Sequence, residues 1–244
     1  MKHLEKKSPW AVAVIIPARN EGSSIACCIE SIISSAAYRP LVGFWIVVVA
    51  DSCNDNTVKQ ARNALGCCGE VVTCTVGSPG TARRVGAAAA LSHFSDVDPN
   101  QLWLANTDAD TCVPREWLAN HLSFADQGIA AVAGIVKIDA VPGHSDDLAR
   151  AIMIDYAIAN DGSHNHVHGA NLGVRADAYL DAGGWSHLTV SEDHCLWRRL
   201  GLRGWAIAAS AHSIVVTSGR LQGRAQGGFA DLLRRKLECL NGSI

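Results

Sequence analysis

The sequence predicts an α/β fold in which a mostly parallel sheet is flanked by helices. Short apolar runs rich in β-branched residues recur along the N-terminal half, segments with apolar residues at helical spacing separate them, and polar turns follow the runs. Hydrophobic residues make up 48% and charged residues 18% of the 244 residues. This composition is typical of a compact globular protein with a large core and excludes a disordered chain.

Strands and helices alternate up to about residue 106. The continuous apolar run at 11–16 indicates a strand that is covered on both faces, and apolar residues from Ile25 to Ala36 recur at helical spacing after it. The same pattern then predicts strands at 45–50, 71–76 and 101–105, with helices at 58–65 and 81–94. Such alternation predicts a parallel sheet.

Beyond residue 106 the alternation is less regular. We predict a strand at 130–138 and helices at 116–125, 146–159 and 193–200. No repeat or low-complexity segment separates the two halves. The whole chain, 1–244, is therefore expected to form a single domain with a soft boundary near residue 106.

Charge, cysteine content and the length of the apolar runs indicate which binding partners and which cellular compartment to expect. Lys plus Arg number 21 and Asp plus Glu 23, a formal charge of −2 that gives no general reason to bind nucleic acid. The nine cysteines contain no CxxC pair, which favours buried thiols in a reducing compartment, most simply the cytoplasm. The longest apolar run, 41–50, is shorter than the ~20 residues of a membrane-spanning helix. We therefore expect no transmembrane segment.

Polar residues follow three of the predicted strands, at 17–21, 51–55 and 106–110. In an open parallel sheet, ligands bind beyond the carboxyl ends of the strands, so these residues are candidate ligands for a substrate. No GxGxxG motif follows the first strand and no GxxxxGK[ST] motif is present. Asp108 and Asp110 offer another way to bind a phosphate, because two carboxylates can hold a divalent cation that neutralises a diphosphate. Taken alone, this DxD spacing is more often a solvated turn or a helix cap.

Five motifs occur in an order and spacing that resemble one known family. They are VIIPARNE at 14–21, VVADSCNDNT at 48–57, NTDADT at 106–111, GAN at 169–171 with Arg175, and EDH at 192–194 with Leu196, Arg199 and Leu200. This succession resembles the family 2 glycosyltransferases of the GT-A fold over nearly the whole chain. The resemblance implies an inverting transfer of a sugar from a nucleotide-diphosphate donor to an acceptor hydroxyl. It also implies a nucleotide-binding half at about 9–106 and a metal- and acceptor-binding half at about 107–244.

The resemblance implies a role for each matching residue. The base and ribose of the donor would contact Pro17, Ala18, Arg19, Glu21 and Asp51. The diphosphate and a divalent metal, Mn²⁺ or Mg²⁺, would lie at Asp108 and Asp110, with His212 as a further metal ligand and Arg83 or Arg84 adding positive charge. The acceptor would lie beside Gly169, Ala170, Asn171 and Glu192. Many members carry two adjacent aspartates after the second strand, whereas this chain has Ala50 and Asp51, which leaves the donor base open.

Asp193 is the candidate catalytic base. Direct displacement requires a group that takes the proton of the acceptor hydroxyl, and Asp193 begins a predicted helix whose free backbone amides can hold its carboxylate. The ED motif of the family supplies the same assignment. The alternative is that Ser191, Glu192 and Asp193 simply cap this helix.

The C-terminal basic segment has three interpretations. Arg220 or Arg224 could reach the donor phosphates from a mobile flap, the segment could contact an anionic membrane at its inner face, or Arg234 to Lys236 could belong to a plain solvated helix. For Arg234 to Lys236 the solvated helix is the simplest interpretation.

Two other functions compete with the leading one. A catalytically silent GT-A module could bind a saccharide or protein, and a sugar nucleotidyltransferase could use carboxylate-held magnesium, although its usual phosphate loop is missing. The donor sugar, the acceptor (saccharide, lipid or small molecule) and the oligomeric state stay open.

Overall fold

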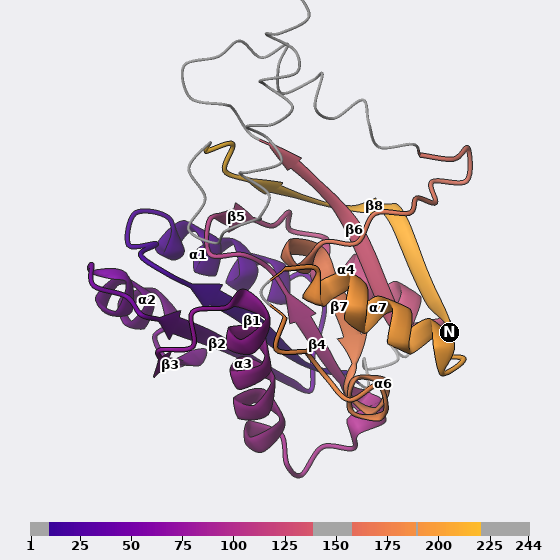
Figure 1. Cartoon of the computed structure of the whole chain (residues 1–244), viewed down its shortest axis with the longest axis horizontal. Helices are drawn as coiled ribbons and strands as arrows, with labels where there is room; N and C mark the ends of the chain where they lie inside the picture. Colours follow the sequence, from indigo (N-terminus) through magenta and orange to yellow (C-terminus); the bar gives the residue numbers. More distant parts are fainter. Residues whose placement is uncertain (1–9, 139–157, 189, 221–244) are drawn as a thin grey trace, which may run out of the picture.

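The computed structural model describes residues 10–138, 158–188 and 190–220. In these ranges eight strands form one sheet in the order β3-β2-β1-β4-β7-β6-β8-β5 (Figure 1). Their bounds are β1 (Ala11–Ala18), β2 (Gly43–Asp51), β3 (Gly69–Cys74), β4 (Leu102–Asn106), β5 (Thr111–Cys112), β6 (Ala131–Ile138), β7 (Leu172–Arg175) and β8 (Ile207–Thr217).

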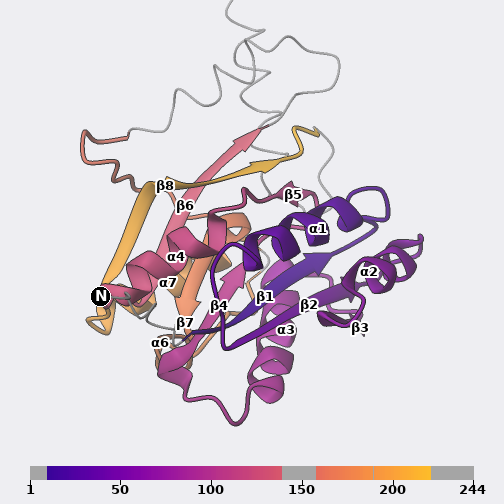
Figure 2. The same cartoon turned by 180° about the vertical axis from the view of Figure 1, so that it is seen from behind.

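Helices cover both faces of this sheet, as the two opposite views show (Figures 1 and 2). The helices are α1 (Ile25–Ala36), α2 (Thr57–Leu65), α3 (Pro79–His93), α4 (Trp117–Asp126), α6 (Ala176–Asp181) and α7 (Glu192–Leu202), with short 3₁₀ turns η1 (Pro99–Gln101) and η2 (Gly169–Asn171). Alternate residues of β1 contribute to the two core layers. Val12, Val14 and Ile16 pack with α1, α2 and α4, whereas Ala11, Ala13 and Ile15 pack with α3, α6 and α7.

The predicted α/β class with a mostly parallel sheet is confirmed, with two reversed strands. The pairs β1 with β2, β1 with β4, β2 with β3 and β6 with β8 are parallel. Strand β7 is antiparallel to both β4 and β6, and β5 is antiparallel to β8. Six strands therefore run in one direction, and β5 and β7 run in the other.

Most predicted elements occur within one to three residues of their expected ends. Four elements, β5, β7, β8 and α6, were not predicted from the sequence, and three of them are six residues or shorter. The predicted helix at 146–159 falls mainly on 139–157, outside the described residues, and so do Arg224 and Arg234 to Lys236.

The prediction of buried thiols is wrong for part of the set. Cys27, Cys67 and Cys112 are exposed, while Cys28, on the core-facing side of α1, is buried. The spacing of Cys27 and Cys28 on one helix explains the difference, because neighbouring helical residues point in directions about 100° apart. Within the described ranges, no helix has the length and apolar character needed to cross a bilayer.

Candidate active site

The loops after β1 and β2 lie side by side because these strands are parallel neighbours, with Ala18 opposite Ala50. The two loops are joined by hydrogen bonds. The Asn54 amide N–H donates to Asn20 Oδ1 at 2.9 Å, and the Glu21 amide N–H donates to Thr57 Oγ1 at 2.7 Å. Asn20 has a φ of 55°, in the left-handed region. The predicted donor residues at 17–21 thus form one continuous rim with the end of β2.

Asp51 is fixed at this rim. Its side chain is buried, and Oδ1 accepts hydrogen bonds from the amides of Val76 and Gly77 at 2.8 and 3.1 Å and from Ser52 Oγ at 3.0 Å. All three donors reach the same oxygen. The carboxylate is therefore held in one orientation by the start of the loop that follows β3.

Arg83 connects two regions that are far apart in the sequence. This side chain, only 4% exposed, reaches from α3 to Asp108 Oδ1 through Nη2 and to Glu192 Oε1 through Nη1, both at 2.5 Å. Burial by itself lowers the pKa of Arg83, but the charges of Asp108 and Glu192 raise it overall, so the guanidinium stays charged. The buried cation therefore joins the end of β4 to the start of α7.

Gly169 brings the η2 turn against this cation. A Cβ at Gly169 would lie 2.6 Å from Arg83 Cζ, so a larger residue at this position would displace the guanidinium. The Gly169 amide N–H donates to Asp193 Oδ2 at 2.9 Å. Three segments named by the sequence motifs, at 108, 169 and 192–193, therefore meet around one guanidinium.

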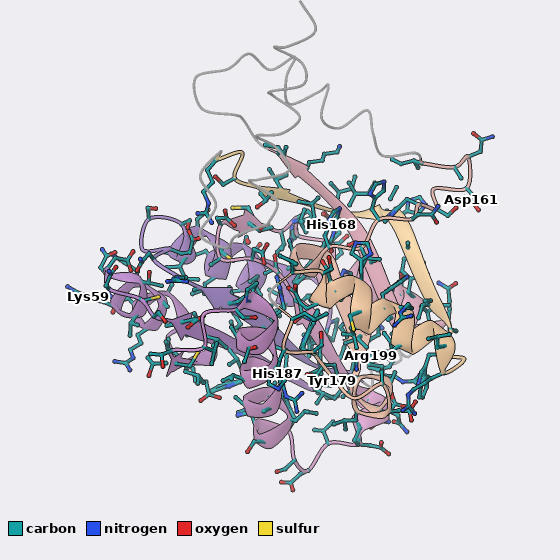
Figure 3. All side chains as sticks on the ribbon, in the orientation of Figure 1. Lys59, Asp161, His168, Tyr179, His187 and Arg199 are labelled. Carbon is teal, nitrogen blue, oxygen red and sulfur yellow. The ribbon has the colours of Figure 1, made fainter. Side chains whose placement is uncertain are left out.

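Two neighbours of Asp193 have shifted pKa values. Burial raises the pKa of its neighbour Glu192, although Arg83 acts in the opposite direction. Burial also lowers the pKa of His168 to about 4, although the Asp193 carboxylate raises it. At neutral pH, His168 is therefore an uncharged imidazole, and Figure 3 shows it near the centre of the molecule.

The loop before α7 is held from both sides. Arg199 donates to the carbonyl oxygens of Ala182 and Gly184, and the Trp185 amide donates to Tyr179 Oη at 3.2 Å. Figure 3 labels Arg199 and Tyr179 at the side of α6 and α7. Arg84 also contacts this loop, because its Nη1 donates to the Trp185 carbonyl at 3.2 Å. Arg83, and not the exposed Arg84, therefore points into the site.

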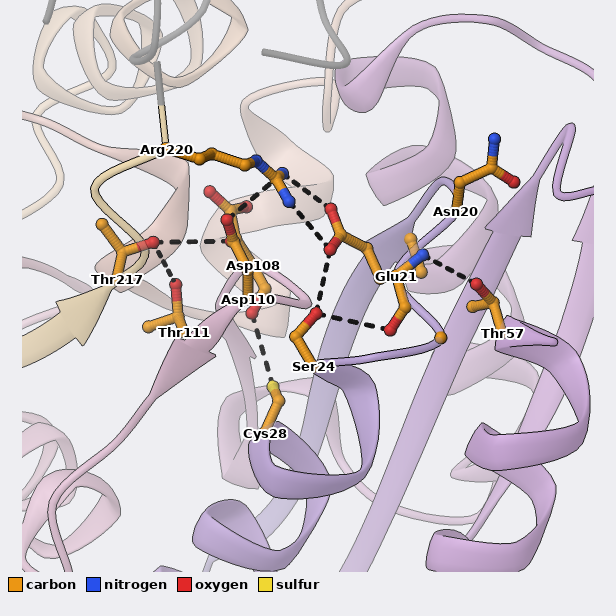
Figure 4. A network of polar contacts seen from close by, with 12 residues as sticks. Asn20, Glu21, Ser24, Cys28, Thr57, Asp108, Asp110, Thr111, Thr217 and Arg220 are labelled. Carbon is orange, nitrogen blue, oxygen red and sulfur yellow. Dashed lines mark hydrogen bonds and ion pairs between the residues drawn. The ribbon is translucent and has the colours of Figure 1, made fainter. Parts of the chain in front are cut away.

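A second ionic cluster joins Arg220, Glu21 and Asp110 (Figure 4). Arg220 Nη1 and Nη2 donate to the two carboxylate oxygens of Glu21 at 2.9 and 2.7 Å, and Nη2 lies 3.2 Å from Asp110 Oδ2. Thr217 Oγ1 donates to Asp110 Oδ1 at 3.4 Å. Burial and the charge of Asp108 raise the pKa of Asp110 to about 6, against the effect of Arg220. Arg220 thus supplies the cation that balances the carboxylates of Glu21 and Asp110.

His212 lies away from both ionic clusters. His212 is exposed beside Gly162, and its backbone precedes Thr217 by five residues of β8, roughly 15 Å in a strand. The structure therefore does not bring His212 to Asp108 and Asp110. Across 10–138, 158–188 and 190–220, no group of three or more His, Cys, Asp or Glu side chains is arranged to hold a metal.

Asn171 is wholly buried behind the η2 turn. Its Oδ1 accepts from Trp117 Nε1 at 2.9 Å, and its Nδ2 donates to the carbonyls of Ile135 and Ser213 at 2.9 and 3.0 Å. His121 Nε2 also lies 3.2 Å from Oδ1. The amide therefore ties η2 to α4, β6 and β8.

A family model described as "Glycosyltransferase like family 2" matches residues 9–236. The chain belongs to this glycosyltransferase family. No curated protein matches the sequence of this glycosyltransferase domain.

Solved structures show that the domain has the GT-A fold. Residues 1–349 of S. aureus TarS in complex with UDP align with a TM-score of 0.63 and 18% identity over 85% of this chain. The mannosyltransferase PcManGT from Pyrobaculum calidifontis, in complex with GDP-Man and Mn²⁺, aligns with a TM-score of 0.63 and 19% identity over 87% of this chain. The alignments cover 60% and 58% of those two chains.

Several contacts of this site were not predicted from the sequence. The pairing of Arg220 with Glu21 spans 199 residues, and the contact of Thr217 with Asp110 spans 107 residues. No local pattern indicates such partners. One local signal was available, since Asp55 followed two residues later by Thr57 is typical of a turn in which the carboxylate accepts from the threonine, and Asp55 Oδ1 does accept the Thr57 amide at 2.9 Å.

Proposed function

We propose that this family 2 domain is an inverting glycosyltransferase that moves a sugar from a nucleotide-diphosphate donor to an acceptor hydroxyl, with a divalent metal. One observation carries the proposal. The buried Arg83 joins Asp108, at the end of β4, to Glu192, and the next residue, Asp193, is held by the amide of Gly169. A cation, a carboxylate at a strand end and a candidate base are thereby assembled from four separate segments.

The donor nucleotide would bind at the rim of β1 and β2. Pro17, Ala18, Arg19, Glu21 and Asp51 are the proposed contacts of the base and ribose. The fixed orientation of Asp51 supports this assignment, because a ligand's hydroxyl or N–H group gains most from an acceptor that is already ordered. The two neighbouring structures hold UDP and GDP-Man, which supports a nucleotide-diphosphate donor for this domain.

The proposed metal ligands are Asp108 and Asp110. Their carboxylate oxygens are the ligands that Mg²⁺ and Mn²⁺ prefer, and the raised pKa of Asp110 indicates a carboxylate that an added cation would stabilise. A bound metal would supply positive charge to the departing diphosphate. His212 lies outside this set, so the proposal needs no histidine ligand.

Asp193 would act as the base. Its carboxylate takes the proton of the acceptor hydroxyl while that oxygen bonds to the anomeric carbon, and the bond from this carbon to the nucleoside diphosphate breaks. The hydrogen bond from Gly169 holds Asp193 Oδ2 in place. Gly169 and Ala170 would face the acceptor, Glu192 would orient it through Arg83, and Asn171 would keep η2 in position.

The test combines nucleotide binding with turnover. Thermal unfolding is measured with UDP, GDP, ADP and dTDP, with and without Mn²⁺ or Mg²⁺, and a nucleotide at a hundred times its Kd should stabilise the protein by about 2.7 kcal/mol. Asp193→Asn should keep this metal-dependent shift and lower turnover by about 10²-fold or more, because the base is lost and the shape is not. Donor hydrolysis without acceptor serves as the readout until an acceptor is known.

Asp181→Asn is the matched control. Asp181 is a surface carboxylate that pairs with Arg203, and its replacement should change neither binding nor turnover. Unaltered turnover in Asp193→Asn would refute the base assignment. The absence of a shift with every nucleotide, together with no donor hydrolysis, would favour a silent binding module, and pyrophosphate release from a nucleoside triphosphate would favour a nucleotidyltransferase.

A further inference from the structure

Two exposed cysteine side chains meet beside the second ionic cluster, in which Arg220 contacts Glu21 and Asp110. Cys27 lies in the first turn of α1 and Cys112 ends β5, and their Sγ atoms are 3.3 Å apart although 85 residues separate them in the sequence. The sulfur atoms of a disulfide are about 2.05 Å apart, so a shift of little more than 1 Å would allow a bond. Solvent reaches both side chains, so a small oxidant can reach them as well.

We propose that Cys27 and Cys112 form a modification site, a dithiol that a peroxide oxidises reversibly to an intramolecular disulfide. One sulfur attacks a peroxide oxygen, the O–O bond breaks, and a sulfenic acid and one water form. The second sulfur attacks the sulfenic sulfur, the S–S bond forms, and a second water leaves. Two thiols and one hydrogen peroxide thus give one disulfide and two waters, with two electrons passing from sulfur to oxygen.

The neighbouring cysteines do not offer the same chemistry. Cys28, next to Cys27, is buried, and its S–H donates to the carbonyl of Asp108 at 3.3 Å. Burial raises the pKa of Cys28 well above its usual value, which keeps it a thiol. Cys67 is exposed, but its near neighbour is the adjacent Cys68, and two sequence neighbours do not readily form a disulfide.

The position of the dithiol connects it to the proposed metal and donor site. Cys112 follows Asp110 by two residues, and its strand pairs with Val216 and Thr217 of β8. On the other side, Ser24, which precedes α1, donates through Oγ to Glu21 Oε2 at 2.9 Å. A disulfide would therefore fix the spacing between the segments that carry Asp110 and Glu21, the two carboxylates that Arg220 bridges.

The modification is tested on the full chain. Reduced protein is treated with hydrogen peroxide, its thiols are counted, and tryptic peptides are analysed by mass spectrometry before and after dithiothreitol. We expect the loss of two thiols and a crosslink to the peptide 85–115, in which Cys112 is the one cysteine, with full reversal by dithiothreitol. Cys27→Ser and Cys112→Ser should each abolish the crosslink.

Two further cysteine variants serve as controls for Cys27→Ser and Cys112→Ser. Cys28→Ser and Cys67→Ser should both retain the crosslink, which also distinguishes Cys27 from its neighbour on the same peptide. The proposal would be overturned by a wild-type protein that yields no crosslinked peptide under peroxide, by thiol loss that is the same in Cys27→Ser and wild type, or by irreversible sulfinic acid at these positions.

A second measurement concerns the site and rests on the proposed function. The metal-dependent nucleotide shift is compared in the reduced and the crosslinked chain, and we expect at least a threefold weaker affinity after oxidation, restored by dithiothreitol. Equal affinity in the two forms would overturn this coupling. Absence of nucleotide binding in both forms would count against the proposed function, while the crosslink would still establish the modification site.

Discussion

Arg83 and Arg84 are adjacent in the sequence and have different environments. Replacing Arg83 with Met would leave Asp108 and Glu192 near each other without their shared cation. We expect the free energy of unfolding to fall by about 3 kcal/mol, near the lower end for a broken buried ion pair because Asp108 is partly exposed. Urea denaturation of the purified variant measures this loss.

Arg84→Met is the control for this variant. Arg84 is exposed, and its Nη1 donates to the carbonyl of Trp185, so its loss should cost less than about 1 kcal/mol. Similar losses for the two variants would contradict the assignment of Arg83 as the buried link between β4 and α7.

Asp110 should make the stability of the metal-free protein depend on pH. Its pKa is raised from 3.8 to about 6 on folding, so the folded protein binds this proton more tightly than the unfolded chain does. The stabilisation from this group is complete below pH 4 and is lost as the pH rises from about 4 to 6. Asp110→Asn should therefore raise the free energy of unfolding by up to about 2 kcal/mol at pH 7 and leave it unchanged at pH 4.

The measurement is urea denaturation of both proteins across this pH range, without metal or nucleotide. The same variant should lose the metal-dependent nucleotide shift, so stability and binding would change in opposite directions. A variant that is less stable than the wild type at pH 7 would show that the contacts with Arg220 and Thr217 outweigh the cost of the buried charge.

At the scale of elements, close packing of β6 against η2 and β8 requires a glycine. A Cβ on Gly134 would overlap Asn171 Nδ2 and the carbonyl oxygen of Ser213. Gly134→Ala should lower the free energy of unfolding by about 2–3 kcal/mol, because backbone must move to admit the methyl group. The loss is measured by urea denaturation.

Gly201, in the last turns of α7, provides the contrast. A Cβ there would meet Ile207 Cδ1 at 3.5 Å, an ordinary contact, and alanine has the higher helix propensity. Gly201→Ala should therefore leave stability unchanged or raise it by up to about 1 kcal/mol. A destabilised Gly201→Ala beside an unaffected Gly134→Ala would contradict this account of the two positions.

Elements with a strong apolar pattern were predictable from the sequence, and short or half-exposed ones were not. Strands β1, β2 and β4 are almost wholly buried, so their residues form continuous apolar runs. Strand β7 has four residues and β5 has two, too few to show a period. The reversed direction of β7 depends on pairing with β4 and β6, which no local pattern records.

The same limit applies to the candidate site. The loops after β1, β2 and β4 could be predicted to meet, because they end parallel strands. Which of Arg83 and Arg84 faces the carboxylates depends on the rotation of α3, and the position of His212 depends on the register of β8 against β6. Both are set by tertiary packing.

At the scale of the whole molecule, one sheet connects both halves of the chain. Strand β4, from the first half, pairs with β7, from the second, and each hydrophobic layer contains residues from both halves. We expect a single cooperative unfolding transition, because neither half can keep its core without the other. Scanning calorimetry should give equal calorimetric and van't Hoff enthalpies, and two resolved transitions would show two domains.

The ion pair between Arg220 and Glu21 makes Arg220 a tethered counter-ion. Its guanidinium contacts Glu21 and Asp110 from the end of β8, so its local concentration at these carboxylates is set by the chain and does not change with dilution. On the proposed function, a metal ion in solution competes with this built-in cation by mass action. The free metal concentration at which the site fills then depends on how strongly the metal binds these carboxylates relative to Arg220. It rises as the ion pairs of Arg220 become stronger.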